Sequence, residues 1–419
     1  MTLSLQSWLD LFHRSPILYK DFVKVFKVKS YNGQVSPLSD IIESKSIKSS
    51  FVKMLYNVFE QDRIRYLTNF YNKSLDIKSY PPDETLPICI QNDKHTIHKN
   101  RIRNIYYKEL LQLTKTIQPN IRNYFDVILD LFKHNIIDYK LLTPSSLLLL
   151  DKGTSLSSIL SAYYFRSSIM NPTIPYSITT ICNTDKIKLF TPTLGWSSYA
   201  LGALSNPALH EYVGIDVIPK VCRNTEQLLR KHNIKHNIIC KPSEHVYQDT
   251  AFLKKYKNHF DLVFFSPPYY ELELYEGKLQ STNQYKEYPE WLEKYWRPTV
   301  QLCYHVLASN SIMSYIVSGY KHKGKYINLS KDMNSIMKQE GFTLKRSIHI
   351  STKNIKITKH KDLREKLYIF TKGNINISRT RFLTSNCKTK RNTKRKTKHK
   401  TKRKTKRKTK HKTRRTKNK

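Results

Sequence analysis

Acidic residues, clustered cysteines and long apolar runs are all scarce in this sequence. The 419 residues include 32 Asp and Glu against 74 Lys and Arg, which leaves a net charge of +42. The six cysteines are scattered, with no Cys-x-x-Cys pair and no Cys/His spacing typical of zinc ligands. We therefore expect no metal site and no disulfide framework, and the reduced thiols indicate an intracellular protein.

No stretch approaches the ~18 consecutive apolar residues that a membrane span requires. Residues 1–10 also lack a basic segment followed by a long apolar core, so the sequence predicts neither a membrane protein nor a signal peptide. Apolar residues make up only 39% of the chain, yet 28 Tyr and 17 Phe provide ample material for a hydrophobic core. The length leaves room for two or three domains.

The positive charge is concentrated at the carboxyl end. Residues 388–419 hold 14 Lys, 6 Arg and no acid, which accounts for +20 and leaves +22 for the rest of the chain. Threonine recurs at every fourth position from Thr389 to Thr413. Because such low-complexity sequence cannot bury a core, we expect residues 376–419 to form a disordered tail. Its use is nucleic-acid binding, targeting to the nucleus or to DNA in the cytoplasm, or simple solvation.

The remainder of the chain divides into two parts. Residues 1–150 are expected to be mainly helical, because apolar residues recur at spacings of three and four, most clearly over 41–71. Strands and helices then alternate over 151–375, which predicts an α/β domain with a doubly wound parallel sheet. The expected strands are 187–190, 212–216, 237–240, 260–265, 311–317, 347–350 and 367–370.

The fourth of these strands runs directly into a rigid polar turn. Residues 260–265 are almost entirely apolar, as in the centre of a parallel sheet covered on both faces. Pro267 and Pro268 then end the strand, because neither can donate to the ladder. Ser266 and Tyr269 are thus presented at the carboxyl end of a strand, where open α/β sheets bind ligands.

This turn has the chemistry to hold an exocyclic amine. The Ser266 hydroxyl and an adjacent backbone carbonyl can accept its two N–H bonds, and the Tyr269 ring can stack on an extruded base. The first strand leads into a turn with Gly195 near its centre, and the second strand ends in Asp216, which can hold ribose hydroxyls. By itself, an acid after a strand is as often a helix N-cap.

Taken together, these segments resemble the S-adenosyl-L-methionine-dependent DNA methyltransferases that modify the amino group of cytosine N4 or adenine N6. The resemblance covers about residues 160–345 and rests on the segments 190–196 (FTPTLGW), 212–216 (YVGID) and 266–270 (SPPYY). The segments 273–275 (ELY) and 288–292 (YPEWL) resemble sequences located after the catalytic motif in one branch of that family.

The resemblance implies a Rossmann-like methyltransferase domain with S-adenosyl-L-methionine as cofactor and double-stranded DNA as the favoured partner. It implies that Thr191, Pro192 and Gly195 lie at the methionine moiety, that Asp216 holds the ribose, and that Glu244 lies near the adenine. By the same resemblance, the catalytic motif is Ser266, Pro267, Pro268 and Tyr269.

Two positions depart from the family pattern. The family usually has an acid where Thr191 stands and a second glycine where Ser197 stands, so we expect Ser197 to narrow the space beside the donor. Either the donor site is attenuated or the chain is a catalytically degenerate nucleic-acid-binding protein. An RNA guanine-N2 methyltransferase is a third interpretation, because such enzymes share a similar Pro-Pro-aromatic turn. The target sequence is expected to be read by residues 1–150, by the loop 271–288, or by both.

Overall fold

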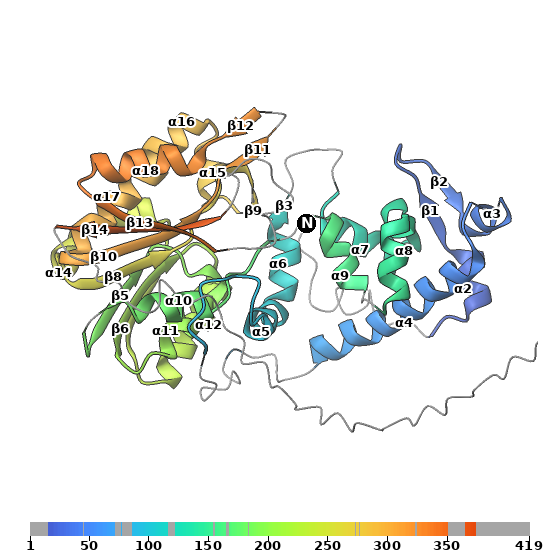
Figure 1. Cartoon of the computed structure of the whole chain (residues 1–419), viewed down its shortest axis with the longest axis horizontal. Helices are drawn as coiled ribbons and strands as arrows, with labels where there is room; N and C mark the ends of the chain where they lie inside the picture. Colours follow the sequence, from blue (N-terminus) through green and yellow to red (C-terminus); the bar gives the residue numbers. More distant parts are fainter. Residues whose placement is uncertain are drawn as a thin grey trace, which may run out of the picture. The chain divides into compact units, whose positions relative to one another are not determined.

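The structure is a computed structural model of the chain (Figure 1). It describes residues 16–44, 46–71, 77, 86–115, 122–153, 156–164, 167–182, 184–272, 274–275, 277–322, 325–350 and 365–373. The expected tail, 376–419, lies outside the described residues. The described part has two hydrophobic cores, one of them in the amino-terminal region and the other around a seven-stranded sheet.

The amino-terminal core is built mainly from helices, as the sequence predicts. The helices are α2 (Tyr19–Val25), α3 (Leu38–Glu43), α4 (Ser49–Tyr71), α7 (Tyr124–Phe132), α8 (Pro144–Asp151) and α9 (Leu156–Tyr163). They accompany a small sheet of order β2-β1-β4, made from β2 (Val35–Pro37), β1 (Lys27–Lys29) and β4 (Ile136–Asp138). Because α9 packs into this core, the amino-terminal unit continues beyond residue 150 to about Tyr164.

Two helices of the amino-terminal sequence instead pack against the sheet domain. They are α5 (Ile97–Ile105) and α6 (Tyr107–Leu113), and Ile102, Tyr106 and Leu110 belong to the core of the sheet domain. The short strand β3 (Thr114–Lys115) follows α6 and pairs with β9 (Leu274–Tyr275), which lies just after the Pro-Pro turn. The sequence does not reveal this contact, because it joins segments about 160 residues apart.

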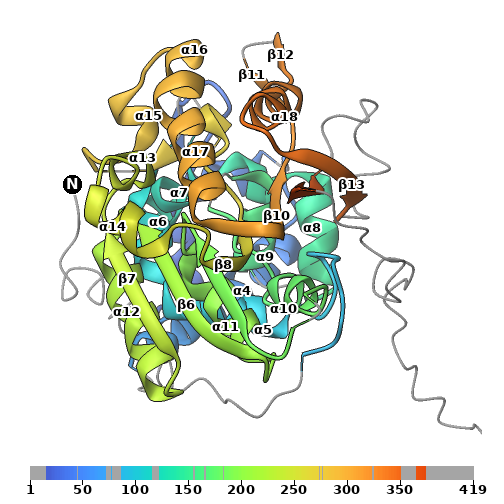
Figure 2. The same ribbon diagram turned by 90° about the vertical axis from the view of Figure 1, so that its left-hand side faces the viewer.

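The large sheet has the order β13-β14-β10-β8-β5-β6-β7. Its strands are β5 (Ile187–Thr191), β6 (Leu209–Asp216), β7 (Lys235–Cys240), β8 (Phe260–Phe265), β10 (Leu307–Val317), β13 (Thr343–His349) and β14 (Lys366–Lys372). The parallel pairing of β8, β5, β6 and β7 confirms the doubly wound arrangement, and Figure 2 shows β6 and β7 side by side. The sheet is not parallel throughout, because β14 runs antiparallel to β10 and β13.

Helices cover both faces of this sheet (Figure 1). The first group packs on β6, β7 and β8, and the second group packs on β10 and β13. The first group is α10 (Thr173–Thr179), α11 (Ser198–Leu204) and α12 (Pro219–Lys231). The second is α17 (Arg297–Val306) and α18 (Leu329–Gln339), and α14 (Thr250–Tyr256) packs against α17. Covered on both sides, the β8 side chains from Leu262 to Phe265 are at most 1% exposed. This burial explains their continuous apolar run.

The cysteines agree with the sequence expectation only in part. Cys182, Cys222, Cys240 and Cys303 are free thiols. Cys89 is disulfide-bonded, so the expectation of reduced thiols throughout is wrong at this position. Within the described ranges, no group of three or more His, Cys, Asp and Glu side chains has the arrangement of a metal site. None of the described helices is long and apolar enough to cross a membrane.

Candidate active site

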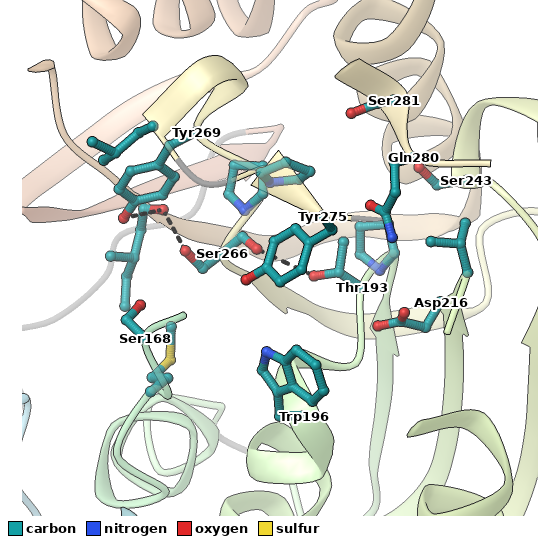
Figure 3. A pocket seen from close by; sticks show the side chains of 18 of the residues that line it. Ser168, Thr193, Trp196, Asp216, Ser243, Ser266, Tyr269, Tyr275, Gln280 and Ser281 are labelled. Atoms are coloured by element: carbon teal, nitrogen blue, oxygen red, sulfur yellow. Dashed lines mark hydrogen bonds between the residues drawn. The ribbon is translucent and has the colours of Figure 1, made fainter. Parts of the chain in front are cut away.

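A cavity of about 490 Å³ opens at the carboxyl ends of β5, β6, β8 and β10. Figure 3 shows that Thr193, Asp216, Ser266, Tyr269 and Tyr275 all reach into it. Its volume lies in the range typical of small-molecule sites. Eight of the nine site residues expected from the sequence line this cavity: Pro192, Gly195, Asp216, Glu244, Ser266, Pro267, Pro268 and Tyr269.

Thr191, the ninth expected residue, is not among the lining residues. It ends β5 with a fully buried side chain, and its hydroxyl donates a hydrogen bond to the carbonyl of Thr193. The threonine therefore stabilises the turn in which an acid is usual, but it brings no charge to the cavity. Thr193 itself lines the cavity, two residues further along.

The turn after β5 has an unusual backbone. Gly195, Trp196 and Ser197 all have positive φ, at 51°, 57° and 62°. For the two residues with a Cβ, this conformation costs about 1–2 kcal/mol each. At Gly195 a Cβ would lie 2.1 Å from the ring of Tyr199, so the absence of a side chain is required here for space as well as for conformation.

Ser197 is held in this conformation by buried hydrogen bonds. Its hydroxyl lies 2.6 Å from the Tyr106 hydroxyl and 2.8 Å from Thr225 Oγ1. The side chain is fully buried and does not line the cavity, so the expectation that Ser197 narrows the donor space is corrected. These contacts, to Thr225 of α12 and to Tyr106 after α5, offset the cost of a positive φ at a residue with a Cβ.

Asp216 connects two turns at the edge of the sheet. Its carboxylate accepts hydrogen bonds from the backbone N–H groups of Leu194 and Ile218, each at 3.0 Å. Burial raises the pKa of Asp216, and these backbone donors oppose that rise. A carboxylate can accept about four hydrogen bonds, so Asp216, which lines the cavity, can organise the turn and still accept from a ligand hydroxyl.

Glu244 is a buried acid with an unfilled hydrogen-bonding position. It lies in the short helix α13 (Ser243–Val246), is only 3% exposed, and its Oε1 has no hydrogen-bond partner among the described residues. Burial raises the pKa of Glu244 to about 7. The hydroxyl of Tyr295, another lining residue, is likewise buried and unpartnered within the described chain. Two such groups in one cavity point to a polar ligand, because unpaired buried polar atoms are costly.

Ser266 is fixed by three hydrogen bonds from three segments. Its hydroxyl donates to the carbonyl of Ile316 at 3.1 Å, its N–H donates to Tyr199 Oη at 3.0 Å, and its carbonyl accepts from Thr193 at 3.2 Å. Because the hydroxyl proton is engaged by a main-chain carbonyl, the Oγ lone pairs remain available as acceptors. This is the state required to hold an amine.

The Tyr269 ring is anchored at its hydroxyl. The hydroxyl lies 3.3 Å from the Ile316 carbonyl and 3.2 Å from Glu365 Oε1. Tyr270, the next residue, adopts a positive φ of 50° and turns its ring away, toward Tyr288 and Trp291. The backbone after the Pro-Pro turn thus directs the two consecutive tyrosines to different surroundings.

The loop after the turn forms another part of the wall. Tyr275 packs against Trp196 with ring centroids 6.1 Å apart, and Gln280 and Ser281 also line the cavity. Because Tyr275 pairs with Thr114, strand β3 of the amino-terminal sequence holds this part of the wall in place. The two segments expected to read the target are therefore in contact.

Several lining residues were missed by sequence reasoning. Tyr199 and Tyr295 lie inside helical stretches, and nothing in the sequence around them distinguishes a cavity-lining tyrosine from a tyrosine of the hydrophobic core. Ser318 and Gly319 follow β10, and the rule that ligands bind where parallel strands end could have identified them. Glu365 could not have been found, because its position depends on the reversed direction of β14.

No protein-family model matches the chain, and no curated protein matches it. Among solved structures, the [4+2]-cyclase SpnF is 11% identical, with a TM-score of 0.34, over 49% of this chain and 84% of its own. TrmN from Thermus thermophilus is 11% identical, with a TM-score of 0.31, over 48% of each chain. A TehB-like SAM-dependent methyltransferase from Corynebacterium glutamicum is 11% identical, with a TM-score of 0.31, over 52% of this chain and 93% of its own. At these identities and TM-scores, the similarities give no evidence about the activity of this protein.

Proposed function

We propose that this protein transfers a methyl group from S-adenosylmethionine to an exocyclic amino group of a base in DNA. The observation that carries the proposal is the state of Ser266, whose hydroxyl proton is held by the Ile316 carbonyl and which lines the same cavity as Asp216 and Glu244. A site for an amine and a site for a nucleoside-like ligand are thus parts of one cavity.

The residues on the Asp216 side fit the proposed cofactor. Asp216 has lone pairs for the ribose hydroxyls, and the unpartnered Glu244 Oε1 can accept from the adenine amino group. Gly195 lines the same cavity, and its lack of a side chain lets the Tyr199 ring pack against the backbone of this turn. When bound there, S-adenosylmethionine supplies an electrophilic methyl group.

On the other side, the Pro-Pro turn prepares the nucleophile. Ser266 Oγ accepts one amine hydrogen and a carbonyl of the turn accepts the other, which localises the nitrogen lone pair and points it at the donor. As the new N–C bond forms, the sulfur of the donor would keep the electron pair of the S–C bond, and both acceptors would stabilise the positive charge on nitrogen. The proton that the nitrogen then loses would pass to water, because the Ser266 hydroxyl already carries its own proton. These acceptors need no reorganisation, because Tyr199, Thr193 and Ile316 already fix Ser266.

The target base must leave its helix to reach this turn. The ring of Tyr269, fixed by the hydrogen bonds of its hydroxyl, provides a stacking surface worth ~1–3 kcal/mol per base. A net charge of +22 outside residues 388–419 supports the approach of a polyanion. We assign DNA recognition to the loop 271–288 together with residues 97–115, because β9 and β3 join the two segments.

Two measurements test the proposal. Isothermal titration of the full-length protein with S-adenosylmethionine should give saturable binding, and a matched Asp216→Ala variant should weaken it by at least about 100-fold. Mass spectrometry of nucleosides from unmethylated duplex DNA treated with protein and cofactor should show N6-methyladenine or N4-methylcytosine.

The outcomes separate the competing functions. DNA binding without cofactor binding would identify a degenerate nucleic-acid-binding protein. N2-methylguanine in treated RNA, with unmodified DNA, would identify an RNA methyltransferase. Either result would overturn the proposal.

A further inference from the structure

Gln280 belongs to the loop after β9 but lies on the cofactor side of the cavity. Its side chain lines the cavity, and Figure 3 shows it extending toward the end at which Asp216 and Ser243 lie. Tyr269, which receives the target base in the proposed mechanism, lies at the opposite end. The loop assigned to DNA recognition therefore also forms part of the wall around the proposed cofactor.

The backbone of this loop is fixed by hydrogen bonds on both sides of Gln280. The Gln280 N–H donates to the Gly277 carbonyl at 3.2 Å, and its own carbonyl accepts from the N–H of Asn283 at 2.8 Å. The Asn283 side chain closes the turn, because its Nδ2 donates to the carbonyls of Tyr275 and Gly277. These bonds set the point from which the Gln280 side chain enters the cavity, and they tie it to β9.

The far end of the loop is held beside helix α13. Trp291 Nε1 donates to Ser281 Oγ at 3.0 Å, and Ser281 is only 8% exposed. Burial raises the pKa of Tyr285, and the carboxylate of Glu244 contributes to this rise. The loop is thus held close to the residue assigned to the cofactor adenine.

The Gln280 amide is available to a ligand. In the described part of the chain the amide makes no hydrogen bond, although the backbone of the same residue makes several. An amide can donate two hydrogen bonds through its NH2 group, whereas the Asp216 carboxylate can only accept. This end of the cavity therefore has an acceptor, Asp216, and a free donor, Gln280.

A ribose diol matches this combination. A hydroxyl that donates its proton to the Asp216 carboxylate keeps two lone pairs on its oxygen, and in a buried site these require a donor. The backbone N–H groups of Leu194 and Ile218 cannot serve, because they are already bonded to the carboxylate. The NH2 group of Gln280 can supply the missing donor.

We propose that Gln280 binds the ribose of the cofactor by donating a hydrogen bond to a hydroxyl oxygen whose proton Asp216 accepts. This inference rests on the function proposed above and adds a residue of the target-recognition loop to the cofactor site. Because β9 joins this loop to β3, one continuous structural unit then contacts both ligands of the reaction.

The test combines Gln280→Ala with S-adenosylhomocysteine that lacks either the 2′- or the 3′-hydroxyl. Isothermal titration of the full-length protein measures the affinity of wild type and variant for the natural and the two deoxy ligands. We expect Gln280→Ala to weaken the binding of S-adenosylhomocysteine by about 3- to 10-fold, as for one hydrogen bond between neutral groups. The loss caused by removing the hydroxyl that Gln280 holds should be at least about threefold smaller in Gln280→Ala than in the wild type.

Gln280→Glu distinguishes a hydrogen-bond donor from a residue that only shapes the wall. Glutamate has nearly the same size, but its carboxylate cannot donate and faces the same end of the cavity as Asp216, so at pH 8 this variant should bind more weakly than Gln280→Ala. Gln248→Ala removes an exposed glutamine outside the cavity and should behave as the wild type. Thermal melting without ligand should not separate Gln280→Ala from the wild type, because the variant breaks no hydrogen bond within the described chain.

The outcomes separate three explanations. Equal affinities of the wild type and both Gln280 variants, or losses that are additive for both deoxy ligands, would overturn the role of Gln280 while leaving methyl transfer intact. A Gln280→Ala variant that loses affinity for duplex DNA but not for S-adenosylhomocysteine would overturn this role in favour of target reading. A wild-type protein that binds no S-adenosylhomocysteine would overturn the proposed function itself.

Discussion

The hydroxyl of Thr193 donates a hydrogen bond to the carbonyl of Ser266, at 3.2 Å and across 73 residues of sequence. Thr193 follows β5 and Ser266 follows β8, and these strands are parallel neighbours in the sheet. The bond therefore joins the turn assigned to the methyl donor to the turn assigned to the amine. A second link runs from Ser266 N–H to Tyr199 Oη, near the start of α11. The two parts of the site are rigidly connected before any ligand binds.

The first prediction concerns Ser266→Ala. Loss of the Oγ acceptor should lower kcat by at least about 100-fold, because one of two groups that orient the amine is removed. Cofactor affinity should stay within about threefold, since Ser266 lies on the target side. Single-turnover methylation and calorimetry measure the two effects separately. Ser205→Ala, at the end of α11 and outside the cavity, is the control. Product formation at the normal rate by Ser266→Ala would remove Ser266 from the mechanism.

The second prediction concerns pH and Glu244, whose pKa is raised to about 7 by burial. Because the ionised carboxylate is the stronger acceptor, cofactor affinity should rise as the pH increases from 6 to 8. Stability should change in the opposite direction. Between the ordinary carboxyl pKa and about 7 the folded state binds more protons than the unfolded state, so the free energy of unfolding falls as pH rises through that window.

A Glu244→Gln variant separates these effects. It should melt at a higher temperature than the wild type at pH 8, by a stability difference on the order of 3 kcal/mol. Its cofactor affinity should be weaker at pH 8 and nearly independent of pH. Calorimetric titrations and thermal melts across pH 5–9 provide the data. An unchanged pH profile in Glu244→Gln would exclude this carboxyl group as the titrating residue.

The third prediction concerns Ser197 and Tyr106. Ser197→Gly relieves a positive φ that costs about 1 kcal/mol, but it deprives Tyr106 and Thr225 of a buried partner, at about 1–3 kcal/mol. The difference between these two effects is a net destabilisation of about 0–2 kcal/mol, and we expect no gain in cofactor affinity. Tyr106→Phe combined with Ser197→Gly should be less destabilising than the sum of the single changes. Tighter cofactor binding by Ser197→Gly would show that the serine does obstruct the donor.

The fourth prediction concerns Gly195→Ala. The new Cβ would lie 2.1 Å from the Tyr199 ring, on a backbone with φ of 51°. Displacement of Tyr199 would also release its hydrogen bond with Ser266 N–H, so one methyl group should impair both parts of the site. We expect a stability loss of about 2–3 kcal/mol and loss of cofactor binding, measured by denaturant unfolding and calorimetry. Gly153→Ala, which meets no atom within 4 Å but shares the positive φ, controls for backbone strain.

The fifth prediction concerns the tail. Deletion of residues 388–419 removes a charge of +20 and should weaken duplex binding while making log Kd less steeply dependent on log salt concentration. Fluorescence anisotropy between 50 and 300 mM salt measures both quantities. Cofactor affinity of the truncated protein serves as the control and should not change. An identical salt slope would restrict the tail to a targeting role.

The sequence by itself determined the sheet domain and most of the cavity wall. Apolar runs such as 260–265 and turns such as 266–269 are local patterns, and parallel strands necessarily bring their carboxyl ends to one edge. Gly195, Asp216 and Ser266 could therefore be placed at one site from the sequence.

Only the tertiary structure decided how these residues are held. Ser197 looked like an obstruction, because nothing local shows that its hydroxyl turns away to Tyr106, 91 residues earlier. Glu365 enters the site because β14 runs antiparallel, and strand direction is set by packing over the whole sheet rather than by the residues of the strand. Thr191 does not line the cavity for a local reason, because its hydroxyl donates to the carbonyl of Thr193 within the same turn. Local sequence determines where the turns occur, whereas contacts between distant segments largely determine which side chains face the cavity.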